Sequence, residues 1–285
     1  MAGPPAVRVV RTVEAVRAER AELPAPVGLV PTMGALHEGH LSLLRRARGE
    51  CRSLIASLFV NPAQFGPGED FASYPRDEER DARLFAETGV DLLFAPGIEE
   101  IYPPGHATTV TVGGAEERPE GLSRPGHFTG VATVVTALLS IVAPDRAYLG
   151  EKDAQQLAVV SRLVRDLALP VEVVACPTVR DPDGLALSSR NVYLSREERR
   201  QALSLSAGLR AAAAAFAAGV RDAGELRRIV SGCVSSQPLA VLDYVSLADG
   251  EMREEIEGEV QGEAVLSVAA RVGGTRLIDN VRLRP

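Results

Sequence analysis

Short apolar runs alternate with amphipathic segments from residue 27 to residue 179, and this alternation limits the possible folds most strongly. The pattern predicts buried strands at 27–32, 53–61, 90–96, 146–151 and 171–179. It predicts helices between them at 39–51, 76–89, 130–144 and 153–169. Apolar strands that alternate with helices form parallel sheets whose two faces are both covered. We therefore expect an α/β fold with a doubly wound parallel sheet.

The sequence changes character after about residue 180. A turn-rich segment, DPDGLALSSRN at 181–191, is followed by predicted helices at 196–219 and 223–236. The remaining apolar runs predict strands, which we expect to pair antiparallel, at 242–249, 264–272 and 275–283. We place a domain boundary near residue 178, with a larger domain at 1–178 and a smaller α+β domain at 179–285.

Charge and cysteine content restrict the functional class and the compartment. The net charge is −7 and no basic cluster is extensive, so a nucleic-acid partner is not expected. Apolar runs are too short to span a membrane, and residues 1–20 lack the apolar core of a secretory signal. Three widely spaced cysteines form neither a disulfide framework nor a zinc site. We expect a cytoplasmic protein that neither enters nor binds a membrane.

The segment PTMGALHEGHL at 31–41 holds two of the four histidines, His37 and His40. It follows a predicted strand and begins a predicted helix, where backbone N–H groups bind phosphate. Imidazoles at this position donate to phosphate oxygens, and Gly34 and Gly39 allow close approach of a ligand. Ordinary loop polarity remains an alternative, and a metal site is disfavoured because the spacing is not that of H-E-x-x-H.

Two further segments carry groups suited to phosphate. GEKDAQQL at 150–157 contains Lys152, the one lysine among 31 basic residues. Its ammonium suits phosphate, whereas Asp153 fits either a ribose hydroxyl or a helix N-cap. LALSSRN at 185–191 supplies hydroxyl, backbone and guanidinium donors at the domain junction.

Two apolar loops contain isolated polar side chains. FVNPAQF at 59–65 places Gln64 after a strand, where its amide can fix a small polar substrate. SRPGHFTG at 123–130 contains Arg124 and His127, and we interpret His127 as structural rather than catalytic. No P-loop, G-x-G-x-x-G or G-x-S-x-G motif is present.

Seven segments together resemble one family. They are PTMGALHEGH, FVNPAQF, YPRD, RPGHFTG, GEKDAQQL, DGLALSSRN and RLIDN, in this order and across nearly the whole chain. The sequence resembles the pantoate–β-alanine ligases, within the broader nucleotidyltransferases that share the H-x-G-H signature. The resemblance implies a Rossmann-like domain, a C-terminal domain that closes over the site, and a homodimer. It implies that ATP, with Mg²⁺, converts pantoate to pantoyl adenylate and pyrophosphate, and that β-alanine then displaces AMP to give pantothenate.

The resemblance also implies residue roles. The ATP-binding residues would be Pro31, Thr32, Met33, Gly34, His37, Gly39, His40, Gly150, Lys152, Asp153, Val179, Leu187, Ser188, Ser189 and Arg190. His40 would donate a proton or stabilise the transition state, with His37 and Lys152 as further catalytic residues. Gln64 and Gln156 would hold pantoate, with Gln64 also near β-alanine. The metal ligands stay open, because Arg80 stands beside Asp81 where relatives tend to be acidic.

Two other hypotheses are compatible with the motifs. One is an adenylyltransferase of the same fold that uses another acid or a nucleotide monophosphate. A phosphate-bearing acceptor would call for more cations than the Gln64 and Gln156 pair provides. The other is a nucleotide sensor that binds ATP without turnover, which the presence of both His40 and Lys152 disfavours.

Overall fold

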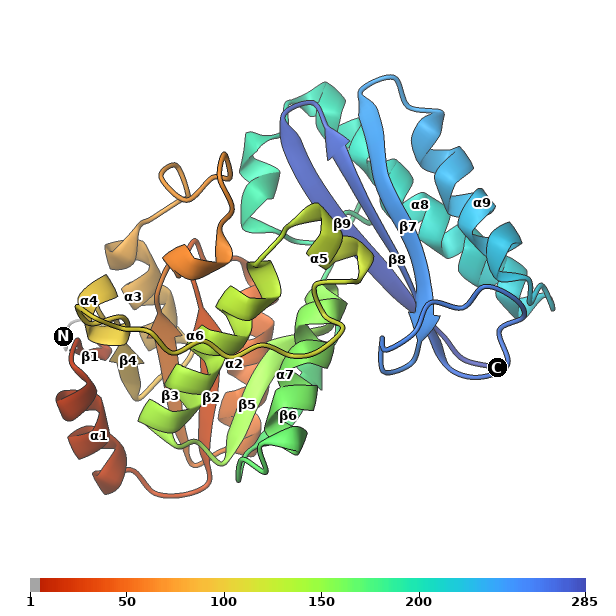
Figure 1. Cartoon of the computed structure of the whole chain (residues 1–285). Helices are drawn as coiled ribbons and strands as arrows, with labels where there is room; N and C mark the ends of the chain where they lie inside the picture. Colours follow the sequence, from red (N-terminus) through yellow and green to blue (C-terminus); the bar gives the residue numbers. More distant parts are fainter. Residues whose placement is uncertain (1–5) are drawn as a thin grey trace. The chain divides into compact units, whose positions relative to one another are not determined.

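The computed structural model describes residues 6–285, which form two compact units (Figure 1). Unit 1 comprises the described residues up to Glu151 together with Val159–Pro177, and unit 2 comprises Lys152–Ala158 and Thr178–Pro285. Residues 1–5, which begin the predicted first domain and the stretch inspected for a secretory signal, lie outside the described residues. Within residues 6–285, no helix has both the length and the apolar character needed to cross a membrane.

Unit 1 is built on a six-stranded sheet in which every pairing is parallel. Its strands are β1 (Arg8–Val10), β2 (Val27–Thr32), β3 (Ser53–Leu58), β4 (Leu92–Phe94), β5 (Arg146–Gly150) and β6 (Glu172–Cys176). They lie in the order β1-β4-β3-β2-β5-β6. The chain therefore steps from β2 to one side through β3 and β4, and then to the other side through β5 and β6. This confirms the predicted doubly wound parallel sheet.

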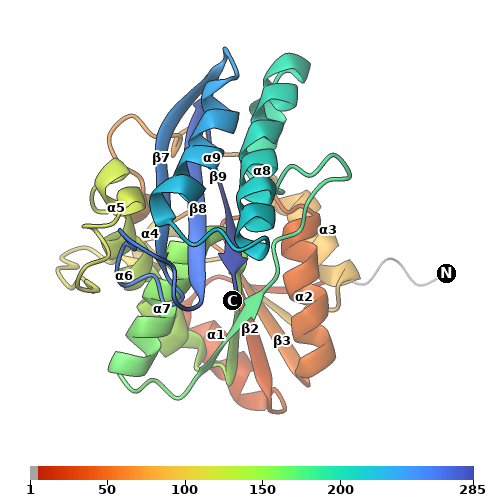
Figure 2. The ribbon, with the colours of Figure 1, turned by 90° about the vertical axis from the view of Figure 1, so that its right-hand side faces the viewer.

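Helices cover both faces of this sheet (Figure 2). On one face, α2 (Glu38–Glu50) and α3 (Glu78–Glu87) pack around a core that includes Leu44 and Phe85. On the other face lies α6 (His127–Val142), which is apolar on most sides, as expected of a buried helix. It begins three residues before the predicted start and ends at Val142, two residues before the predicted end, with Ala143 as its C-cap.

Shorter elements complete unit 1. They are α1 (Val13–Glu22), η1 (Pro62–Gln64), α4 (Ile98–Ile101) and α5 (Pro119–Ser123). η2 (Glu151–Asp153) and α7 (Ala154–Asp166) follow β5, and both elements cross the boundary between the units. Strand β1 and helix α1 are not among the elements predicted from the sequence. At three residues, β1 is too short to produce a recognisable period.

Unit 2 contains an antiparallel sheet of three strands, β7 (Ala240–Asp249), β8 (Ala264–Val272) and β9 (Thr275–Leu283), in the order β7-β8-β9. Helices α8 (Arg196–Ala217) and α9 (Ala223–Ser235) share an apolar core with the sheet, which includes Leu209, Val230 and Leu266. Ser195 and Glu198 form a capping box that fixes the start of α8. The short helix η3 (Ser189–Tyr193) precedes α8.

Gly130 allows α6 to approach η1 directly, which yields a first prediction. A methyl group there would overlap the carbonyl group of Ala63 and lie 2.7 Å from the amide nitrogen of Gln64. Because backbone cannot rotate away as a side chain does, Gly130→Ala should lower the free energy of unfolding by about 1–3 kcal/mol or more.

The matched control is Gly49→Ala in helix α2, where a methyl group meets nothing within 4 Å. This change should raise the free energy of unfolding by roughly 0.5–1 kcal/mol, because alanine restricts the unfolded chain. Urea denaturation of both variants measures the contrast. Equal effects of the two substitutions would show that α6 does not depend on close contact with η1.

Candidate active site

The connection between β2 and α2 is a tight loop that ends in two histidines. Gly34 adopts a φ of +86°, and a methyl group there would lie 2.7 Å from Leu58 and 2.9 Å from the Asp81 carboxylate. His37 is the N-cap of α2, and its Nδ1 accepts the Gly39 N–H at 3.1 Å. The Nδ1 of His40 in turn accepts the His37 N–H at 3.4 Å. The histidines therefore supply the side chains of a capping box.

This cap determines which ring nitrogens donate. A ring nitrogen that accepts an N–H bond carries no proton, so the proton of a neutral imidazole lies on Nε2. The rings of His37 and His40 lie with centroids 4.1 Å apart, at the N-terminus of α2. Two Nε2–H donors and the positive end of a helix dipole therefore occur together, an arrangement that favours an anion.

The buried carboxylate of Asp81 holds the backbone of the loop between β2 and α2. Asp81, in the first turn of α3, is 1% exposed, and its two oxygens accept the N–H groups of Ala35 at 2.8 Å and Leu36 at 2.9 Å. The Arg80 guanidinium donates to the Leu36 carbonyl at 3.0 Å. Burial raises the pKa of Asp81, while the two backbone N–H bonds act in the opposite direction. Ala35 has a φ of +52°, so Asp81 holds a loop that the backbone alone disfavours.

Gln64 lies beside this loop, in the short helix η1 that follows the neighbouring strand β3. It ends η1, is 8% exposed, and donates from Nε2 to the Met33 sulfur at 3.1 Å. The Asn61 amide donates to Gln64 Oε1 at 3.0 Å, and the Tyr102 hydroxyl donates to Asn61 Oδ1 at 2.7 Å. Burial raises the pKa of Tyr102 to about 12, so the phenol stays protonated and keeps this bond. The orientation of the Gln64 amide is thus set by a chain of three side chains.

Unit 2 contains the second group of predicted site residues. The carbonyl of Lys152 accepts the Asn280 amide at 2.9 Å, and its ammonium lies 3.7 Å from Asp153. Val179 and Leu187 are joined by a backbone bond of 3.0 Å. The Ser188 hydroxyl caps η3 by accepting the Arg190 N–H at 3.3 Å. The Asn280 bond ties the Lys152 segment to β9, and the other two bonds order the segment from Val179 to Arg190 internally.

The predicted site residues are thus distributed over two groups. Unit 1 contains Pro31, Thr32, Met33, Gly34, His37, Gly39, His40, Gln64 and Gly150, and unit 2 contains Lys152, Asp153, Gln156, Val179, Leu187, Ser188, Ser189 and Arg190. The structure brings Met33 to Gln64 and His37 to His40. Positioning side chains that were not assigned from the sequence include Asn61, Tyr102, Asp279 and Asn280. Of these four, Asn61, Asp279 and Asn280 lie within the motifs identified in the sequence. The motifs therefore indicated the correct segments but not these residues.

Arg180 shows how Asp279 orders unit 2. Its guanidinium forms two bonds, of 2.6 and 2.8 Å, with the Asp279 carboxylate, which is 3% exposed. The same side chain donates to the Gly184 carbonyl at 3.3 Å, within the turn between Val179 and Leu187. A bidentate pair of this kind fixes orientation as well as distance. Asp279 and the adjacent Asn280 therefore tie the Lys152 segment and the Val179–Leu187 turn to one strand.

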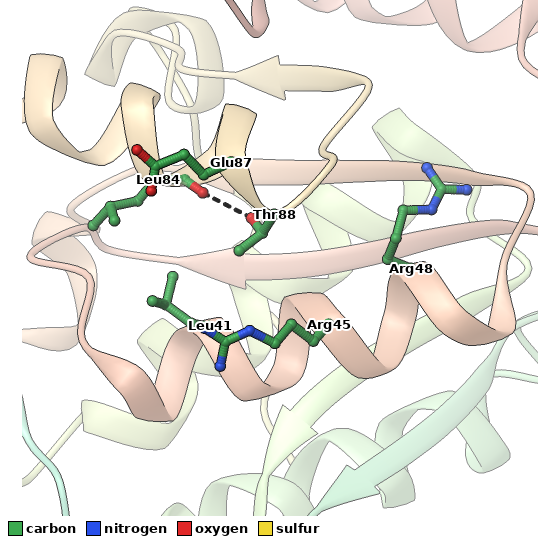
Figure 3. A pocket seen from close by; sticks show the side chains of 6 residues that line it. All are labelled: Leu41, Arg45, Arg48, Leu84, Glu87 and Thr88. Carbon is green, nitrogen blue, oxygen red and sulfur yellow. Dashed lines mark hydrogen bonds between the residues drawn. The ribbon is translucent and has the colours of Figure 1, made fainter. Parts of the chain in front are cut away.

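A separate pocket of about 360 Å³ lies between α2 and α3 (Figure 3). Its lining residues are Leu41, Arg45, Arg48, Leu84, Glu87 and Thr88. Arg48 pairs with Asp91 at 2.7 Å and Arg45 with Glu38, so both guanidinium groups are engaged. None of the predicted site residues lines this pocket.

Comparison with known proteins identifies similar chains. The family model described as pantoate-beta-alanine ligase matches residues 8–282. A pantothenate synthetase of Roseiflexus sp. (strain RS-1) is 54% identical over 274 residues, 96% of this chain and 98% of that protein. The crystal structure of pantothenate synthetase from Thermus thermophilus superposes with a TM-score of 0.92 at 52% identity, covering 98% of this chain and 100% of that one. A pantoate-beta-alanine ligase from Francisella tularensis, complexed with beta-gamma ATP and beta-alanine, has a TM-score of 0.78 at 34% identity, with 97% of each chain covered.

The Asp81 contacts predict that Asp81→Asn destabilises the protein. An asparagine would present an NH₂ group to one of two backbone N–H groups and leave that buried donor unpaired. The expected loss is about 1–3 kcal/mol of unfolding free energy, measured by urea denaturation. Glu79→Gln is the control in the same helix, because that side chain is 88% exposed and pairs with Arg83 at the surface. Its expected effect is below about 0.5 kcal/mol, and a similar loss in both variants would contradict the role of Asp81.

Proposed function

The chain belongs to the pantoate-beta-alanine ligase family and is a ligase, and from this premise we propose that it forms pantothenate from pantoate and β-alanine through a pantoyl adenylate. In the first step a pantoate carboxylate oxygen attacks the α-phosphorus of ATP and pyrophosphate leaves. In the second step the β-alanine amine attacks the acyl carbon, AMP leaves and the amine loses a proton. A carboxylate does not react with an amine until its oxygen becomes part of a good leaving group, and the adenylate provides one.

The topology of the sheet is the observation that carries this proposal. Strand order reverses between β2 and β5, and ligands of doubly wound folds bind outside the carboxyl ends of the strands at such a point. The His37–His40 turn follows β2, and Gly150 ends β5 with Lys152 two residues further on. Two of the segments suited to phosphate thus leave the two central strands at the same edge of the sheet. That the related Francisella ligase was crystallised with beta-gamma ATP and beta-alanine supports the same substrates here.

We assign residue roles on this basis. His37, His40 and the N-terminus of α2 bind ATP phosphates, and His40 donates from Nε2 to oxygens whose charge grows as pyrophosphate leaves. Lys152 adds a point charge, and the other nucleotide contacts are those of Met33, Gly34, Gly39, Gly150, Asp153, Val179, Leu187, Ser188, Ser189 and Arg190. Gln64 and Gln156 hold pantoate, and Gln64 also lies near β-alanine. The work of the site is mainly to position two anions and to neutralise charge.

The resemblance also implies Mg²⁺. Among residues 6–285 no group of three or more His, Cys, Asp and Glu is placed to hold a metal ion, and both oxygens of Asp81 bond backbone N–H groups. These residues do not form a metal cage. We propose that Mg²⁺ enters the site already bound to the ATP phosphates. This is usual for Mg²⁺, which proteins hold with only one or two carboxylates in addition to the substrate phosphates. A homodimer, a cytoplasmic location and a C-terminal domain that closes over the substrates stay predictions.

Pyrophosphate release tests the function directly. With ATP, Mg²⁺ and pantoate alone, we expect release to stop at about one equivalent per site, because the adenylate waits for its amine. Addition of β-alanine should make release continuous, with AMP and pantothenate formed in equal amounts. Binding of ATP with no release under either condition would contradict the ligase and favour a nucleotide sensor. Release with a different acid would favour another adenylyltransferase.

Two variants of His40 separate its catalytic role from its role as a helix cap. His40→Ala removes both and should reduce transition-state stabilisation by about 2.7–4 kcal/mol, as when one preorganised donor is lost. His40→Asn keeps an acceptor near the Nδ1 position for the His37 N–H but removes the Nε2 donor. It should keep its unfolding free energy and lose activity to a similar extent. Gly49→Ala, at the other end of α2, is the active control, and a His40→Asn variant with near-normal turnover would contradict the assignment.

A further inference from the structure

The main-chain carbonyl of Gln64 is held by two side chains from another part of unit 1. His127 Nδ1 lies 2.9 Å from the Gln64 oxygen, and an Arg124 N–H donates to the same oxygen over 3.4 Å. His127 is the first residue of α6 and is 7% exposed, while Arg124 is the C-cap of α5. The two contacts reach across 63 and 60 residues of sequence. The backbone at Gln64 is therefore fixed by groups that do not belong to the proposed substrate contacts.

Arg124 is itself held rigidly by acidic partners. It donates to the two oxygens of Glu69 at 2.7 and 2.8 Å, and it lies 3.7 Å from Glu120. Glu69 also accepts the Gly66 N–H at 3.2 Å, which closes the turn after Gln64. Burial acts to raise the pKa of Glu69, but the hydrogen bonds and charge of Arg124 outweigh it and hold that pKa low. The guanidinium is therefore charged, paired and fixed in direction.

The position of Arg124 determines the tautomer of His127. Arg124 Nη1 lies 3.1 Å from His127 Nε2, and a guanidinium can only donate. His127 Nε2 must therefore be the acceptor, so the ring proton lies on Nδ1 and is donated to the Gln64 carbonyl. A doubly protonated ring would place an N–H opposite the guanidinium N–H. Burial and then the charge of Arg124 lower the pKa of His127, against weaker opposite effects that include Glu120 and Glu69.

Two further contacts hold η1 against α6 beside this bond. Gly130 leaves no space for a side chain between α6 and the Ala63 carbonyl. The Asn61 amide donates both to the Gly130 carbonyl at 3.1 Å and to Gln64 Oε1. The main chain of Gln64 is thus fixed through His127, whereas its side chain is fixed through Asn61.

We propose that His127, as the neutral Nδ1–H tautomer selected by Arg124, is a positioning residue that holds Gln64 for pantoate. The proposal rests on the proposed function, in which Gln64 binds that substrate. In this proposal His127 supports pantoate binding through Gln64 and does not itself contact pantoate. The bond that matters is the one to the Gln64 carbonyl, and the bond to Arg124 serves to select the proton position.

A matched pair of substitutions separates the two bonds. In His127→Asn the side-chain amide lies near the former Nδ1, so it can donate to Gln64 but cannot reach Arg124. In His127→Gln the longer side chain can accept from Arg124 but does not supply the donor at Nδ1. We expect the pantoate KM to change less than about threefold in His127→Asn and to rise about tenfold or more in His127→Gln, the equivalent of one lost hydrogen bond. The ATP KM should be unchanged in both variants.

Other patterns of KM would overturn the proposal. An equal increase of the pantoate KM in both variants, or no increase in His127→Gln, would show that the Gln64 bond does not matter. A parallel increase for ATP would indicate general disruption of unit 1. If the wild-type protein releases no pyrophosphate with pantoate, the proposed function fails instead, and the ring measurement below still decides the tautomer.

Nitrogen NMR of the four histidines tests the tautomer without any substrate. The signals that disappear in His127→Asn are those of His127, and they should show a protonated Nδ1 and an unprotonated Nε2 at pH 7. The opposite tautomer, or an imidazolium at pH 7, would overturn the assignment. The tautomer is read in the wild-type protein, and His127→Asn serves only to assign the signals.

The pH dependence of stability gives a second readout. Because the pKa of His127 is lowered in the folded state, the unfolded chain takes up the proton first as the pH falls below about 6.5. The stabilisation by His127 should be complete above this pH and decline toward the folded-state pKa. Groups near the ring are Arg124, Glu69 and Glu120, with Glu116 bonded to the N–H groups of Gly126 and Thr129 beside it. A difference in stability between wild type and His127→Asn that stays constant from pH 7.5 to 5.5 would contradict the proposal.

Discussion

The parallel pairing of β2 with β3 on one side and β5 on the other is the constraint on which unit 1 depends. Once β2 is central, a right-handed crossover sends α2 over one face, and the return to β5 sends α6 over the opposite face. The loops that leave β2 and β5 therefore diverge instead of covering each other. The topology of the sheet by itself therefore leaves this edge open. The polar segments that follow β2 and β5 begin at this edge.

Buried polar side chains stabilise the backbone of the segments that carry the proposed site residues. Asp81 satisfies two consecutive N–H groups in a loop with unfavourable dihedral angles, and His127 satisfies the Gln64 carbonyl. In unit 2, Asp279 and Asn280 hold the Arg180 side chain and the Lys152 carbonyl. Asp81, His127, Asp279 and Asn280 are all buried, so each of them would carry a desolvation penalty if it lost its partner. The residues proposed to touch substrate are thus placed by residues that do not touch it.

Periodicity was sufficient to predict the parallel sheet, its main helices and the antiparallel sheet of unit 2. It failed for β1, where three residues, two of them exposed, pair only with β4, a partner 84 residues away. The H-x-x-H pattern predicted a helix N-terminus with two imidazoles, but not that these rings close the helix by a capping box. Our interpretation of His127 as structural did not include its bond to Gln64, because a contact across 63 residues leaves no local pattern. The metal ligands stayed open because Arg80 stands beside Asp81 where relatives tend to be acidic.

In α2 the same two histidines cap the helix and belong to the proposed anion site. In most proteins these two roles fall to different residues. In the usual capping box the N-cap residue is serine or threonine and the third helical residue is glutamate or glutamine. Here His37 and His40 close the helix with one ring nitrogen and offer the other to the anion site that we propose. A substitution that removes either ring therefore also removes one bond of the helix cap. Alanine substitution at either histidine will overstate its chemical role, since fraying of α2 contributes to the measured loss.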